Sequence, residues 1–246
     1  MELGTIAQWS SVGITFFAVL VALFKDDILS IFKKPKLIVS ISQTPPDCQK
    51  TKLNIPTVTG SYIPSGIGPQ GPVNSTIQNV ADCYYIRIWI ENNGKSTAKR
   101  IQVSASKLLK QQADLSFREV EGFIPMDLKW SHSQPGNPEI YAEGISPKMG
   151  KHCDLGHIID PKHRSKFPGE DLPEVSRDKT ILSLDIEVQA YTLSHLVPPG
   201  VYQLELKVAG DNCAPVTKVL EITIKGEWFE DQKKMFSEAI GIKLVV

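Results

Sequence analysis

The chain has 246 residues, and its 27 Lys and Arg residues balance its 27 Asp and Glu residues, so the formal net charge is zero. Nucleic-acid-binding proteins usually carry a basic excess, so this balance argues against a nucleic-acid partner. The length allows one large domain, or two small ones, with a real hydrophobic core. The four cysteines (Cys48, Cys83, Cys153 and Cys213) lie far apart without a Cys-x-x-Cys motif, which favours reduced thiols over a disulfide framework.

The stretch Leu3–Phe24 contains no Asp, Glu, Lys or Arg. As a helix it would cover roughly 33 Å, which is about the hydrocarbon thickness of a bilayer. We therefore predict a single transmembrane helix, with Trp9 near one membrane interface. A cleaved signal peptide is one alternative, but it would need a basic segment before the apolar run and small residues at a cleavage site. A buried or in-plane helix is the other alternative, because only Val12–Phe24 is densely apolar.

Lysines flank one side of this stretch. None precedes it, whereas Lys25, Lys33, Lys34 and Lys36 follow it. Because such a bias keeps the basic side in the cytoplasm, we predict a single-pass inner-membrane protein with its N-terminus outside and its C-terminal domain cytoplasmic. Lys33, Lys34 and Lys36 lie close together in the sequence. They are expected to add weak adhesion to anionic lipid, but three lysines fall short of a dedicated polybasic cluster. The anchor and an amphipathic continuation occupy residues 1–35 and end at Pro35.

Small side chains line one face of the predicted span. At helical spacing, this stripe consists of Ala7, Ser11, Thr15, Ala18 and Ala22. Small residues let two helices approach closely in lipid, so the stripe predicts pairing with a second copy or with another membrane protein. The alternative is that such residues are simply common in membrane helices.

Residues 36–246 are predicted to form one β domain. Lys36–Ser42 alternates as a first strand, and Gln43–Asn79 is so rich in Pro and Gly that a long loop is expected. Cys83–Glu91 (CYYIRIWIE) is the clearest strand in the chain, with Tyr84, Ile86, Ile88 and Ile90 on one face. Ser96–Lys107 is the next strand, and the Asn92–Lys95 turn between them, with Gly94 taking a positive φ, predicts a hairpin.

The second half of the domain shows further short strands. They are predicted at Pro125–Trp130, as two pieces within Gly144–Asp160, and at Ile181–Val188, Val201–Val208 and Val216–Ile224. A surface loop is expected at 161–179, a C-terminal helix from Gly226 to about Ala239, and a last short strand at Leu244–Val246. Seven to nine strands with turn signals predict a mainly β fold, an antiparallel immunoglobulin-like β-sandwich carrying the N-terminal transmembrane helix and a short C-terminal helix.

Several stretches carry a family resemblance. ENNGKSTAKRIQV resembles a hairpin motif of immunoglobulin-like bacterial β-sandwiches, and ISPKMGKHCDLGHI, PPGVYQLELKVAGDNCAP and LEITIKGEWFED extend the likeness. In pattern, the chain resembles uncharacterised prokaryotic single-pass membrane proteins with a short N-terminal membrane helix and a cytoplasmic immunoglobulin-like domain. The resemblance implies a location and a fold, and no activity, because a fold of this type hosts many functions.

Possible chemical sites are few. His152, Cys153, Asp154 and His157, with His163 nearby, form the one dense set of potential metal ligands, but a second ligand pair at a standard spacing is missing. A Cys–His nucleophilic pair would need an orienting group and an oxyanion site that nothing in the sequence marks. We therefore predict no catalytic residue, no metal and no cofactor, with a metal-dependent hydrolase on Cys153 and His157 as the enzymatic alternative.

Tyr85 and Trp89 give the strongest strand more aromatic bulk than one buried face requires, so they predict a partner-binding face. The sequence as a whole predicts a membrane-tethered, non-enzymatic interaction or ligand-sensing module with an unknown protein partner. The alternative is an oligomerising effector of a defence or stress system that permeabilises the membrane through its single span.

Overall fold

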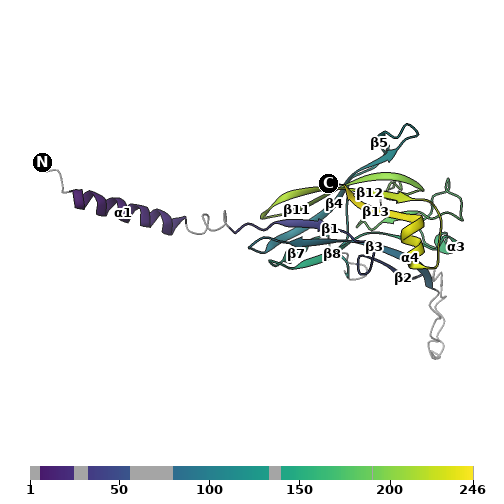
Figure 1. The fold of residues 1–246 in the computed structure, drawn as a ribbon, viewed down its shortest axis with the longest axis horizontal. Helices are drawn as coiled ribbons and strands as arrows, with labels where there is room; N and C mark the ends of the chain where they lie inside the picture. The colour runs from purple at the N-terminus through teal and green to yellow at the C-terminus, as the bar shows by residue number, and fades with distance from the viewer. Residues whose placement is uncertain (1–5, 25–32, 56–79, 133–139, 190, 246) are drawn as a thin grey trace, which may run out of the picture.

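The computed structural model describes residues 6–24, 33–55, 80–132, 140–189 and 191–245, with side chains from residue 13 onward. Two antiparallel sheets make up the β domain (Figure 1). The six-stranded sheet consists of β1 (Leu37–Ser40), β2 (Cys48–Asn54), β3 (Val80–Asn92), β8 (Gly150–Ile159), β9 (Leu182–Leu184) and β10 (Leu196–Val197). The seven-stranded sheet consists of β4 (Ala98–Gln111), β5 (Phe117–Glu119), β6 (Met126–Asp127), β7 (Ala142–Ile145), β11 (Gly200–Gly210), β12 (Cys213–Ile224) and β13 (Ile240–Val245).

Helices are few among the described residues. They are α1 (Ile6–Leu23), α3 (Pro161–Arg164), α4 (Gln232–Lys234) and the π-helical turn η1 (Met235–Ala239). Figure 1 shows α3 and α4 at the end of the domain opposite to the one where the chain enters β1. The domain therefore has two distinct ends, and the end next to β1 is the one reached from the N-terminal helix.

The core lies between the two sheets. In β3 the side chains of Tyr84, Ile86, Ile88 and Ile90 are fully buried, as the alternation of apolar residues predicted. They belong to one hydrophobic cluster with buried side chains of the other sheet, including those of β11. The mainly β, antiparallel, sandwich-type prediction is thus confirmed, while the immunoglobulin-like strand order stays a prediction.

The predicted hairpin around Gly94 is wrong. The two strands exist, but β3 pairs with β1, β2 and β8, whereas β4 pairs with β11 and with β5, β6 and β7. The Asn92–Lys95 turn therefore carries the chain from one sheet to the other. Gly94 has no positive φ, and its lack of a side chain serves a different purpose, since a Cβ there would lie 2.5 Å from the backbone of Pro35.

Two other expectations need correction. The predicted loop at 43–79 contains strand β2 over Cys48–Asn54, and residues 56–79 lie outside the described part of the chain. The C-terminal helix is shorter than predicted, beginning at Gln232 instead of Gly226, and β13 begins directly after it at Ile240. The segment 161–179 forms one helical turn followed by irregular turns, as a surface loop would.

Candidate functional site

The helix α1 exposes large apolar side chains on opposite sides. Its 18 residues include no charged side chain. Ile14, Phe17 and Val21 follow one side at helical spacing and Phe16 and Val19 follow the opposite side, and all five are exposed, Ile14 to 71% and Phe17 to 68%. A helix of this kind is normally buried, either in a protein core or in a lipid bilayer.

Only part of the predicted small-residue stripe belongs to the residues that the structure describes. Thr15, Ala18 and Ala22 are exposed on α1, whereas the side chains of Ala7, Trp9 and Ser11 and the whole of Lys25 lie outside the described part. No helix within the described residues combines the length and the apolar character that a membrane span requires.

The chain enters the β domain through Lys33–Lys36, here called the lead-in segment. It passes directly over the turn between the two sheets, where the Lys36 carbonyl accepts a hydrogen bond from Asn93 N at 2.8 Å and the Lys34 carbonyl accepts one from Lys95 N at 3.3 Å. The path is close enough that only a glycine fits at position 94. The lead-in segment is therefore a fixed part of the domain.

Asn92 joins three chain segments at this end. Its buried side-chain oxygen accepts from Lys36 N at 3.1 Å and Gly94 N at 3.0 Å. Its side-chain nitrogen donates to the carbonyls of Ser96 at 2.7 Å and Ile145 at 2.8 Å. Because every donor and acceptor of this amide has a partner, the residue can remain fully buried at the corner between the sheets.

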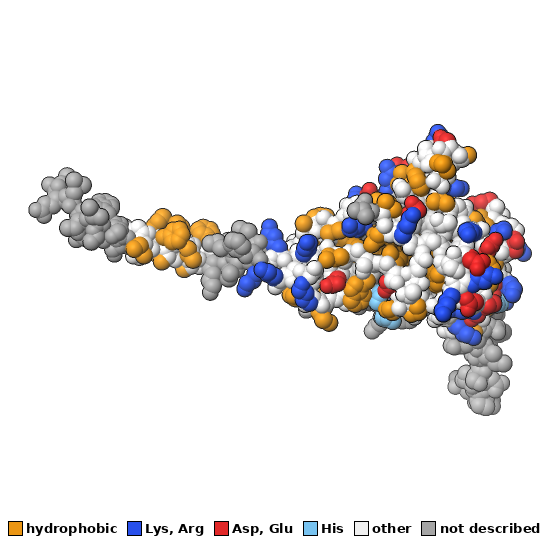
Figure 2. Space-filling view, viewed as in Figure 1, with side chains coloured by type: hydrophobic (Ala, Val, Ile, Leu, Met, Phe, Trp, Pro, Cys, Tyr) orange, Lys and Arg blue, Asp and Glu red, His pale blue; other side chains and the backbone are white. Residues whose placement is uncertain are grey.

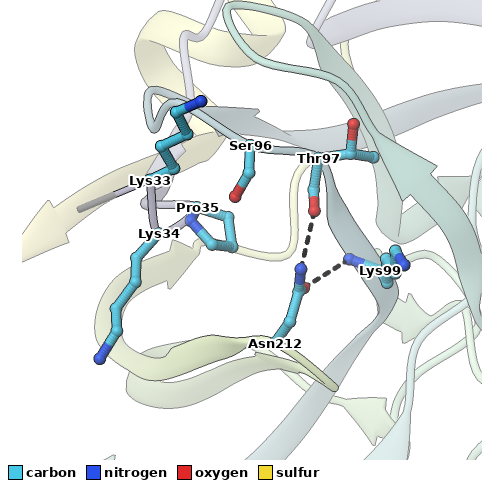
Figure 3. Close-up of a pocket in the computed structure, with 7 residues that line it drawn as sticks. All are labelled: Lys33, Lys34, Pro35, Ser96, Thr97, Lys99 and Asn212. Atoms are coloured by element: carbon cyan, nitrogen blue, oxygen red, sulfur yellow. Dashed lines mark hydrogen bonds between the residues drawn. The ribbon is translucent and has the colours of Figure 1, made fainter. Parts of the chain in front are cut away.

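A groove of about 630 Å³ opens beside this junction (Figure 3). It is lined by Lys33, Lys34 and Pro35 of the lead-in segment, by Ser96, Thr97 and Lys99 at the start of β4, and by Asn212 of the β11–β12 turn. Among the described residues, no acidic side chain lines this groove. The groove is thus a concavity that carries three lysines at the end of the domain where the chain arrives from α1.

Asn212 fixes the far wall of the groove. Its side-chain oxygen accepts from Lys99 N at 2.9 Å, and its side-chain nitrogen donates to the Thr97 carbonyl at 2.9 Å, as the dashed lines in Figure 3 show. The lysines themselves are exposed. A rigid backbone therefore presents mobile positive charges, an arrangement that suits anionic groups.

The predicted partner face lies on the outer side of β3, and both of its residues are partly covered. The Tyr85 ring stacks on His157 with centroids 5.3 Å apart and has Arg87 above it, and the Trp89 ring lies 4.6 Å from His152. A Cβ on Gly150 would lie 2.3 Å from the Trp89 indole, so a glycine at this position of β8 leaves space for the ring. The partner face stays a prediction.

The potential metal ligands of β8 each contact a different group. His152 lies 2.9 Å from Asp47, and the Asp154 carboxylate accepts from Arg87 at 3.0 Å. Cys153 points inward, where its thiol donates to the Lys129 carbonyl. Within the described residues, no group of three His, Cys, Asp or Glu side chains is arranged to hold a metal ion.

The four cysteines are free thiols, and burial makes three of them unreactive. Burial raises the pKa of Cys48 and of Cys83 to about 12, and it raises the pKa of Cys153 well above the ordinary value. The thiolate, which is the nucleophile and the metal ligand, is therefore disfavoured at these positions.

His157, on the outer face of β8, lies between two carboxylates. Burial opposes its charge, but Asp185 Oδ1 lies 3.0 Å from Nδ1 and Glu170 lies 3.8 Å from Nε2. The two carboxylates prevail and raise the pKa of His157 to about 8. The protonated His157 side chain therefore stabilises the folded state. Because its folded-state pKa exceeds the ordinary 6.5, this stabilisation is complete below about pH 6.5 and is lost as the pH rises through 8.

Replacing His157 with Gln should remove this pH dependence. The difference in free energy of unfolding between the native chain and His157→Gln should shrink by about 2 kcal/mol from pH 6 to pH 9. Urea titrations at both pH values measure it, and His132→Gln, at an exposed position, is the control. A difference that does not change with pH would contradict the assignment.

Among the residues that line the groove, the sequence indicates a functional role only for Lys33 and Lys34. Asn92 was expected in a hairpin turn, and Lys99 and Asn212 were not singled out. The only sequence feature that marks these residues is the position of lysines close to predicted turns. A sequence does not show which turns lie at the same end of a sandwich. Lys33 and Lys34 were expected at a lipid interface, and the structure adds that they lie beside Lys99.

No family model matches the chain, and no match was found among curated proteins or among solved structures. The resemblance to prokaryotic single-pass membrane proteins therefore stays a prediction.

Proposed function

We propose that this chain is a membrane-tethered, non-enzymatic interaction or ligand-sensing module, held by its N-terminal helix at the cytoplasmic face of the inner membrane. The observation that carries the proposal is α1, whose large apolar side chains are exposed on opposite sides. Leaving such side chains in water is unfavourable, and a bilayer covers all sides of a helix at once. The proposed span is Leu3–Phe24, part of which lies outside the described residues.

The lysines support the proposed orientation. Lys33, Lys34 and Lys36 follow the helix in sequence, and they are exposed at the end of the β domain where the chain enters it. Basic residues next to a span favour the cytoplasmic side. Buried free thiols suit a reducing compartment, which agrees with this placement.

The work of the domain would be recognition. The proposal assigns no reaction, because His152, Cys153 and His157 each contact a different group. Tyr85 and Trp89 on the outer side of β3 are the proposed partner face, with aromatic area next to charged groups, a composition that is common in protein interfaces.

Fractionation of membranes tests the tether. The native chain should remain in the membrane pellet at high salt and be released by detergent. The double variant Phe17→Arg/Val21→Arg should move to the soluble fraction, because each arginine in a span costs about 3 kcal/mol. Recovery of the native chain in the soluble fraction would contradict the proposal.

A matched control distinguishes membrane insertion of α1 from nonspecific hydrophobic adsorption of the β domain. Leu115 and Tyr191 are exposed hydrophobic side chains of the β domain. Leu115→Arg/Tyr191→Arg makes the same chemical change there, and this variant should still pellet like the native chain. If both double variants leave the pellet, surface hydrophobicity and not α1 would be responsible.

A further inference from the structure

Six exposed lysines gather at the end of the β domain where the chain enters it, here called the lysine-rich end. It consists of Lys33, Lys34, Lys36, Lys95, Lys99 and Lys148. Figure 2 shows positive side chains grouped at this end. They come from three separate stretches of the sequence (33–36, 95–99 and 148), so the cluster is a product of the fold.

The Asn92 junction assembles the cluster. Lys95 and Lys99 belong to the corner that Asn92 stabilises through Gly94 and Ser96. Lys148 comes from the β7–β8 turn, where its backbone nitrogen donates to the Asn92 carbonyl at 2.7 Å and its ammonium group contacts Asn93. Backbone hydrogen bonds therefore hold three separate segments, and their lysines, at one end.

The positive charge of this end is hardly compensated. The four segments that form it (33–36, 92–99, 146–149 and 210–213) contain six lysines and one acidic residue, Asp211. Within the described part of the chain, none of the six lysines forms an ion pair with a carboxylate. A charge of this density on one rim attracts a strongly anionic surface.

We propose that the lysine-rich end binds the phosphate groups of anionic lipids in the adjacent leaflet and holds the β domain against the bilayer. The inference rests on the proposed tether. The groove between Lys33, Lys34 and Lys99 receives a headgroup phosphate, and Lys36, Lys95 and Lys148 contact neighbouring headgroups. Clusters of four to eight basic residues beside a span are typical of such recognition.

Two observations favour a lipid surface over another anion. Eight residues separate Phe24 from Lys33, so the lysine-rich end lies within roughly 30 Å of the end of the apolar helix. Met149, next to Lys148, is 60% exposed and adds an apolar side chain to the same rim. Basic and apolar side chains together suit the boundary between headgroups and acyl chains.

Lipid binding to the full-length chain in a neutral detergent tests the inference, with bound molecules counted by native mass spectrometry. Phosphatidylglycerol should bind at least about tenfold more tightly than phosphatidylcholine, and inorganic phosphate should not displace it. Lys33→Gln/Lys99→Gln should weaken phosphatidylglycerol binding by about 25-fold, or about fivefold for each lysine. Thermal unfolding of the variants should match that of the native chain, because both side chains are exposed.

The matched control is Lys162→Gln/Lys233→Gln, which removes two exposed lysines from α3 and α4 at the opposite end. This variant should bind phosphatidylglycerol like the native chain. Equal binding of the two lipids, equal losses in both double variants, or displacement by inorganic phosphate would each overturn the inference. A chain that pellets with membranes yet shows no lipid preference refutes this inference alone, whereas a chain that does not pellet refutes the tether.

Discussion

Replacing Asn92 with Asp should lower the free energy of unfolding of the β domain by about 4 kcal/mol at pH 7. The new carboxylate can still accept from Lys36 N and Gly94 N, but it cannot donate to the carbonyls of Ser96 and Ile145. The buried Ile145 carbonyl and the part-buried Ser96 carbonyl lose their partners, at about 1–3 kcal/mol each, and a charge is added at a fully buried position. Urea unfolding of the detergent-solubilised chain, followed by tryptophan fluorescence, measures the change.

The neighbouring asparagine provides the control. Asn93 is exposed, so Asn93→Asp should change the free energy of unfolding by no more than about 0.5 kcal/mol. If Asn92→Asp were as stable as the native chain, the junction would not hold the corner between the sheets. The lysine-rich end would then lack its structural basis as well.

Replacing Gly94 with Ala should displace the lead-in segment. A Cβ at this position would lie 2.5 Å from Lys34 O, Pro35 Cα and Lys36 N, all of them backbone atoms that no side-chain rotation can move aside. The variant should lose the hydrogen bond between Lys36 N and Asn92, and we expect about 2–3 kcal/mol of destabilisation. Trypsin should also cleave after Lys36 faster than in the native chain, because that peptide bond leads directly into β1.

Gly241→Ala is the matched control for this variant. Position 241 lies in β13, where a Cβ would make an ordinary contact of 3.5 Å with Thr223. Stability and the rate of tryptic cleavage after Lys36 should be unchanged in Gly241→Ala. Native-like stability and cleavage in Gly94→Ala would show that the lead-in segment has an alternative path.

The alternation of β3 was predicted correctly because it is a local property. Tyr84, Ile86, Ile88 and Ile90 repeat at the period of a strand, and all four are buried in the same core. Strand β2 was missed for the opposite reason, since its sequence CQKTKLN is mostly polar and lies beside a segment rich in Pro and Gly. Two-residue strands such as β6 are too short to show any alternation.

The hairpin prediction failed because a turn sequence does not specify the sheet of the strand that follows it. Asn92–Lys95 has turn chemistry in either case. The outcome depended on distant partners, since β4 pairs with β11 and β3 pairs with β8. The polar pairs on the outer face of the six-stranded sheet are equally non-local, as His152 of β8 and Asp47 before β2 illustrate, 105 positions apart.

By itself, the sequence determined the charge-free apolar helix, the lysines that follow it and the β character of the rest, because composition and short periodicities carry these properties. Only the tertiary structure decided that the chain changes sheets after Asn92, and that Lys95, Lys99 and Lys148 join Lys33 and Lys34 at one end. The physical reason is that strand pairing and buried hydrogen bonds act between residues far apart in the chain. A basic surface built in this way cannot be recognised from a sequence whose net charge is zero.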